Sequence, residues 1–167
     1  MKKKWILVIL AAVMAILSAC GKEEVKPRAI KDTDTCEVCN MAVADDQHAT
    51  QIVLENGKSL IFDDLGCMYT WLKENENEKI AGKFVRDYDD KEWINSEDAT
   101  YVYSLEAKTP MAYHVISFKD KKDAERFTKE HEGSKEMTAK DLAGFNWDQN
   151  KEGHQDQGAA PVEDGSK

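Results

Sequence analysis

The sequence predicts an α+β fold in which two similar ββαβ halves form one compact domain. Three observations favour this class. Strand-like runs flank an Asn-Gly turn, two helical apolar stripes each follow an aspartate, and the order of these patterns repeats along the chain. Of the 167 residues, 41% are hydrophobic and 33% are charged, which is typical of a soluble globular protein. We expect the domain over residues 35–147, with halves of about 35–95 and 96–147.

The first half begins with a hairpin. Polar and apolar residues alternate over residues 48–55, which are rich in Val, Ile and Thr and are predicted to form a strand. Asn56-Gly57 is a strong hairpin signal, and residues 58–62 are predicted to return as the second strand. Asp63 or Asp64 then caps a helix. Its apolar stripe consists of Leu65, Met68, Tyr69 and Leu72. A third strand is predicted over residues 83–88.

The second half repeats this order. Strands are predicted over residues 99–105 and 113–118, separated by a loop with Thr109-Pro110-Met111. Asp120 caps a helix that ends at Glu132-Gly133. One face of this helix carries Ala124, Phe127, Thr128 and His131. A short strand over 135–137 and a helical turn over 139–142 complete the pattern.

The two ends of the chain differ from this domain. Residues 1–19 combine three lysines with an apolar run from Trp5 to Leu17, which is too short to span a membrane and is typical of an export signal. Leu17-Ser18-Ala19-Cys20 resembles a bacterial lipobox, so we expect Cys20 to be lipidated. An ordinary signal peptide or an uncleaved anchor is the alternative. Residues 20–34 are predicted to be a lipid anchor and flexible tether, and residues 148–167 a disordered acidic tail.

Export and charge restrict the partners. The expected location is the extracytoplasmic face of the cell membrane, reached through the lipid. The net charge of −9 becomes −12 when Lys2, Lys3 and Lys4 leave with the signal, which could favour docking on a basic partner surface. A pI near 5.0 argues against nucleic acid as a partner.

The densest group of sulfur atoms is Cys36-x-x-Cys39-x-Met41, directly after the predicted tether. Besides Cys20, three cysteines remain, an odd number that cannot all pair within one chain. A structural disulfide, thiol–disulfide exchange by Cys36 and Cys39, and a zinc site are open interpretations. Zinc usually needs four ligands, and no second close pair is present. The leading interpretation is Cu(I), which prefers thiolate and thioether ligands.

Other candidate ligands lie further along the chain. Met111 follows the rigid Pro110, and His114 lies three residues later. Cys67 lies near a helix N-terminus, which should lower the pKa of its thiol, although a plain buried cysteine is equally consistent with the pattern. Asp63-Asp64 is interpreted as helix capping. No phosphate-binding loop or Ser/His/Asp set is visible, so we expect no catalytic residues and no enzyme.

Together these motifs resemble the NosL family of copper-binding accessory lipoproteins for nitrous oxide reductase. The resemblance rests on the lipobox, the Cys36 to Met41 motif, residues 60–68 and the Thr109-Pro110-Met111 loop, and covers roughly residues 17–133. Cys39 and Met41 match the Cys-x-Met element of the family, Met111 matches its methionine after proline, and Cys36 extends the first motif.

The resemblance implies two ββαβ halves, one bound Cu(I), and delivery of copper to nitrous oxide reductase with its membrane assembly transporter as a partner. Glycines usually follow the second methionine of the family, whereas this chain has Ala112-Tyr113-His114. The predicted metal ligands are Cys36, Cys39, Met41 and Met111, with His114 and Cys67 as further candidates. Service to another exported copper enzyme remains an alternative.

Overall fold

A computed structural model describes residues 24–147 of the chain. The predicted signal, the predicted lipidation site at Cys20 and the predicted acidic tail from residue 148 lie outside the described residues. Within the described part, none of the helices has both the length and the apolar character needed to cross a bilayer.

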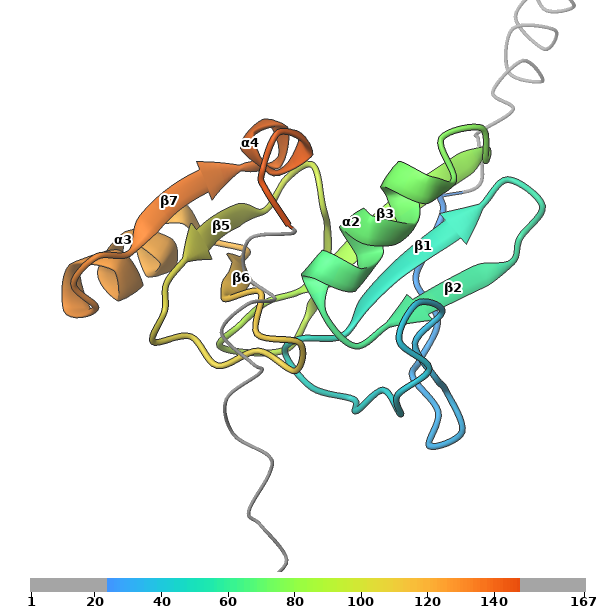
Figure 1. The fold of residues 1–167 in the computed structure, drawn as a ribbon, viewed down its shortest axis with the longest axis horizontal. Coiled ribbons are helices and arrows are strands. Elements are labelled where there is room, and N and C mark those ends of the chain that lie inside the picture. Colours follow the sequence, from blue (N-terminus) through green and yellow to red (C-terminus); the bar gives the residue numbers. More distant parts are fainter. Residues whose placement is uncertain (1–23, 148–167) are drawn as a thin grey trace, which may run out of the picture.

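The first half contains a four-stranded antiparallel sheet with one helix across it (Figure 1). Its strands have the spatial order β2-β1-β3-β4. In chain order the elements are β1 (Thr50–Leu54), β2 (Ser59–Phe62), α2 (Leu65–Glu74), β3 (Ile80–Arg86) and β4 (Trp93–Asn95). The β1–β2 turn depends on Gly57, whose φ of 84° is a left-handed conformation that glycine adopts without strain. Its N–H donates to the carbonyl of Leu54.

The second half contains a three-stranded antiparallel sheet with the spatial order β6-β5-β7. Its elements are β5 (Thr100–Tyr103), β6 (Val115–Phe118), α3 (Lys121–Glu130), β7 (Lys135–Thr138) and α4 (Ala139–Ala143). Each half therefore begins with the strand that lies between its two neighbours, β1 in one and β5 in the other. This shared topology confirms the predicted α+β fold of two ββαβ halves.

Two strand predictions need correction. The strand expected over residues 83–88 is β3, which begins at Ile80 and ends at Arg86, because Ile80 pairs with Leu54 across a bulge. The chain then turns, and the Asp87 carboxylate accepts backbone N–H groups of that turn. The sequence pattern also gave no sign of β4, whose three residues are too few to display a period.

The hydrophobic core joins the halves. One large cluster contains side chains from the first sheet and α2 together with Tyr101, Tyr113 and Val115 of the second half. A smaller cluster under α3 contains Val102 and Ile116, the neighbours of Tyr101 and Val115 along their strands. Since successive strand residues face opposite sides, the second sheet contacts the large cluster with one face and α3 with the other.

Gly66, in the first turn of α2, allows this packing. A Cβ atom there would lie 2.2 Å from the ring of Tyr113, so only glycine lets the helix approach the second half this closely.

The segment before β1 is attached to the first sheet. The Arg28 guanidinium donates to both carboxylate oxygens of Asp34, at 2.6 and 2.8 Å. The backbone of Arg28 also exchanges two hydrogen bonds with the buried side chain of Gln51 on β1. Residues 28–34, which fall within the predicted tether, therefore contact the folded domain.

Candidate metal centre

Cys36 and Cys39 lie on a short loop that is closed by its own backbone. Thr35 and Ala42 form a β-bridge, the N–H of Cys36 donates to the carbonyl of Met41, and the N–H of Asn40 donates to the carbonyl of Cys36. The loop is attached to the first sheet because the N–H of Glu37 donates to the carbonyl of Ile61 on β2. Both thiols are thus brought to the end of β2.

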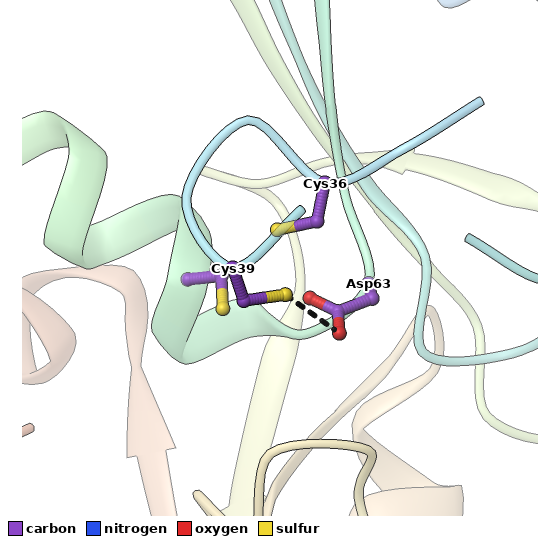
Figure 2. Close-up of side chains that lie close together, drawn as sticks. Cys36, Cys39 and Asp63 are labelled. Atoms are coloured by element: carbon purple, nitrogen blue, oxygen red, sulfur yellow. Dashed lines mark hydrogen bonds between the residues drawn. The ribbon is translucent and has the colours of Figure 1, made fainter. Parts of the chain in front are cut away.

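The junction between β2 and α2 supplies the facing groups. Asp64 is the N-cap of α2, and its carboxylate accepts the N–H of Gly66 at 3.1 Å. Cys67 follows in the first turn of the helix. Asp63 makes no cap, and its carboxylate faces the cysteine loop instead, as Figure 2 shows. The prediction that this aspartate pair caps the helix is therefore right for Asp64 and wrong for Asp63.

Three thiols and one carboxylate come together at this point. The possible ligand atoms of Cys36, Cys39, Cys67 and Asp63 all lie within 4.8 Å of one another. The Cys39 thiol donates to Oδ2 of Asp63 at 3.3 Å (Figure 2). Cys36 and Cys67 are fully buried, whereas Cys39 is half-buried. We call these four residues the thiol cluster; access from solvent is by way of Cys39.

Hydrogen bonding within the cluster separates the acidities of its thiols. The pKa of Cys36 is lowered to about 6, first by a hydrogen bond from the Cys67 thiol and further by backbone N–H groups, against the effect of burial. Burial and the neighbouring Cys36 and Asp63 raise the pKa of Cys39 to about 12. The cluster therefore favours one thiolate, at Cys36.

The expectation that the helix N-terminus lowers the pKa of Cys67 is wrong. Its pKa is raised, first because its S–H donates a hydrogen bond to the sulfur of Cys36 and second because the residue is buried. These local contacts outweigh the favourable end of α2. The interpretation of Cys67 as a buried cysteine is correct, and it is also a member of the cluster.

One carboxylate oxygen of Asp63 has no hydrogen-bond donor among the described residues. The residue is 4% exposed, and within the described chain its Oδ1 is buried without a hydrogen-bond donor. A buried carboxylate oxygen is costly unless a donor or a cation compensates it. This atom is therefore an independent sign that a positively charged ligand fits the cluster.

The two predicted thioether ligands belong to loops that are attached to residues of this site. Met41, at the end of the cysteine loop, is 53% exposed. Met111 is partly buried against the large core, as Cys39 is, and its N–H donates to Oδ2 of Asp64 at 2.9 Å. Asp64 thus fixes the Thr109-Pro110-Met111 loop to the start of α2, beside the cluster.

His114 is not part of the thiol cluster. Its Nδ1 lies 2.8 Å from the carbonyl oxygen of Ala107, so this nitrogen carries the proton and donates. The residue has a φ of 59° directly before β6. The hydrogen bond holds the imidazole against its own loop.

The fold and the cluster define a class of protein: a small α+β binding protein with a centre rich in soft ligands. The chain belongs to the NosL family, whose sequence model matches residues 27–144. Comparison with curated proteins gives no significant match.

Among solved structures, the fold is similar to the crystal structure of the copper chaperone NosL from Shewanella denitrificans. The two chains are 22% identical, with a TM-score of 0.59. The match covers 68% of this chain and 92% of the Shewanella denitrificans chain. The likeness supports the two-half architecture.

Proposed function

We propose that this protein is a metallochaperone, not an enzyme, and that it carries Cu(I) as its cargo. One observation carries the proposal: in a member of the NosL family, three thiols and a carboxylate have their ligand atoms within 4.8 Å of one another. Cu(I) prefers sulfur ligands and is satisfied by few of them. The copper chaperone from Shewanella denitrificans with the same fold supports this choice of metal.

Cys36 and Cys39 are the proposed thiolate ligands, and Met41 and Met111 the proposed thioethers. The half-buried Cys39 and the exposed Met41 give an acceptor access to the copper without unfolding of the domain. A shell of a few soft ligands can be exchanged one at a time, which suits transfer to a second protein.

The proposed cellular role is supported by the predicted lipidation signal at the N-terminus and by the family resemblance. Acylation of Cys20 would hold the domain at the extracytoplasmic face of the cell membrane. Delivery of copper for the assembly of nitrous oxide reductase, directly or through its membrane assembly transporter, is the proposed purpose. Reduced, copper-loaded protein incubated with the copper-free reductase should restore its copper content, and the Cys36→Ser/Cys39→Ser variant should not.

The direct test is an anaerobic titration of the reduced protein in competition with a Cu(I) chelator. We expect one tightly held Cu(I) per chain, with weaker binding in Cys39→Ser and in the double variant Cys39→Ser/Met111→Leu. Leu105→Met, which adds a thioether on an exposed surface, is a control that should change nothing. Lack of stoichiometric binding, or an unchanged affinity in Cys39→Ser/Met111→Leu, would refute the proposal.

The lowered pKa of Cys36 favours one alternative, thiol–disulfide exchange with Cys39. However, Cys36 is fully buried, and a thiolate that attacks a disulfide must be accessible. Metal-free protein that catalyses the reduction of insulin disulfides would favour this alternative over the chaperone.

A further inference from the structure

The thiol cluster contains two groups to which the family resemblance assigns no ligand role, Cys67 and Asp63. The motifs carried over from the family place copper among Cys39, Met41 and Met111. In this chain, the sulfur atom of Cys67, on α2, lies within 4.8 Å of the sulfur atoms of Cys39 and of the buried Cys36. Cys39 is therefore common to the thiol cluster and to the ligand set that the family resemblance implies.

The spacing of the cluster fits a metal. With metal–sulfur bonds of about 2.3 Å, three thiolates in a plane around one ion are about 4 Å apart. The ligand atoms of the cluster are separated by no more than 4.8 Å, so a shift of less than an ångström completes the triangle. Side-chain rotation of the half-buried Cys39 can supply that shift.

Burial distinguishes the two sets of ligands. Cys36 is 0% and Cys67 1% exposed, whereas Met41 is 53% exposed. Ligands in water exchange readily, and ligands in the core do not. The unpaired Oδ1 of Asp63 lies on the buried side, where a cation would compensate it.

We propose that this chain has two positions for one Cu(I), an inner one formed by the thiolates of Cys36, Cys39 and Cys67 and an outer one formed by Cys39 with the thioethers. Copper rests in the inner position and leaves through the outer one, and Cys39 is the ligand common to both. Asp63 orients Cys39 by accepting its S–H in the metal-free protein. This inference rests on the proposed function.

Movement of copper between the two positions exchanges only ligands and protons. Each thiol that binds copper releases its proton to solvent, and each thiolate that is replaced by a thioether takes a proton back. Copper stays Cu(I) throughout, so no oxidant or reductant is consumed.

The test uses protein in which the methionines are replaced by selenomethionine, loaded with one equivalent of Cu(I). Selenium scatters differently from sulfur, so X-ray absorption at the copper edge separates thioether from thiolate ligands. We expect copper surrounded by three sulfur atoms and no selenium. A selenium neighbour would place the resting copper in the outer position and overturn the inference, while leaving the proposed function intact.

Two matched variants complete the test. Cys67→Ser should weaken Cu(I) binding by more than about tenfold and leave two sulfur neighbours, since even changes behind a ligand cost about 10–100-fold. Met41→Leu should keep the three sulfur neighbours of the resting copper but slow the transfer of copper to a bathocuproine chelator. Equal affinity and equal sulfur number in wild type and Cys67→Ser would overturn the inference.

Three further outcomes have a defined meaning. If Cys67→Ser does not fold, as judged by circular dichroism, the selenium measurement on the wild type decides alone. Zn²⁺ bound to the cluster that Cu(I) fails to displace would overturn the inference, because the inner position would then be a zinc site. Failure of the wild type to bind Cu(I) at all would refute the proposed function as well.

Discussion

Asp63 and Asp64 are neighbours with different roles. Asp63 accepts the Cys39 thiol of the N-terminal loop. Asp64, which is 1% exposed, accepts the N–H of Gly66 through one oxygen and the N–H of Met111 through the other. Because the residues are adjacent, the cysteine loop and the Met111 loop are held by consecutive positions of the chain.

Asp64→Asn tests the second of these roles. An amide has a single acceptor oxygen, so either the helix cap or the bond to Met111 is lost and a buried N–H is left unpaired. We expect a loss of about 1–3 kcal/mol in the free energy of unfolding, measured with urea. The exposed Asp98 is a control site, where the same change should have little effect. Equal stability of the two variants would contradict the role of Asp64.

Cys36 should display its lowered pKa directly. Ultraviolet absorbance of thiolate is expected to rise with a midpoint near pH 6 in metal-free protein, because the Cys67 thiol and backbone N–H groups stabilise the charged form. The step should vanish in Cys36→Ser and persist in Cys39→Ser, which keeps its backbone donor. A midpoint near the ordinary value of 9 in the wild type would contradict the hydrogen-bonded arrangement.

The same contacts set the pH dependence of copper binding. Below pH 6, Cu(I) has to displace a proton from the Cys36 thiol. From pH 5 to 8 it also has to displace a proton from Cys39, because the pKa of that thiol is raised to about 12. Since Cu(I) competes with these protons, its affinity should rise with pH and should fall as Cys36 becomes protonated. Chelator competition between pH 5 and 8 measures this trend, and an affinity independent of pH would argue against thiolate ligands.

Among the elements, α2 connects the halves through the contact between Gly66 and Tyr113. Gly66→Ala should cost about 1–3 kcal/mol or more of folding free energy, because the new Cβ would lie 2.2 Å from the aromatic ring and the ring has to move. Thermal unfolding measures the loss. Gly144→Ala, at the end of α4, is the control, since its new Cβ would meet nothing closer than 3.9 Å.

Secondary structure was predicted best where local signals are strong. The Asn56-Gly57 turn and the aspartate before α2 determine their neighbourhoods from within a few residues, so the β1–β2 hairpin and the start of α2 were predicted closely. β4 was missed because its three residues exist through pairing with β3. The predicted start of β3 is three residues too late because Ile80 belongs to the strand only through its pairing with Leu54 on β1, a contact between residues far apart in the sequence.

The site was predictable only in part for the same reason. Cys36 and Cys39 are close in sequence, so their spacing alone pointed to a shared role. Cys67 lies one position off the apolar stripe of its helix, and its burial follows from the loop that covers the start of α2. Asp63 looked like half of a capping pair, and only the three-dimensional contact with Cys39 shows otherwise.

At the scale of the whole molecule, copper should act as a clamp, because the thiol cluster joins the N-terminal loop to α2. A ligand present at about 100 times its dissociation constant adds about 2.7 kcal/mol to folding stability. We therefore expect Cu(I) to raise the melting temperature, and a chelator to reverse the rise. Cys36→Ser/Cys39→Ser should show no rise, and an equal rise in that variant would indicate copper bound elsewhere.

The attachment of Arg28 to Asp34 and β1 limits how far the folded domain can lie from the membrane. Lipidation of Cys20, as proposed, leaves eight residue steps between the membrane and this fixed point, and a fully extended chain covers at most about 29 Å in eight steps. The domain would then move within a layer close to the bilayer surface. A copper acceptor would have to be a membrane protein or a protein that comes close to the bilayer surface. Diffusion of the carrier toward a membrane-bound acceptor would then be confined to two dimensions.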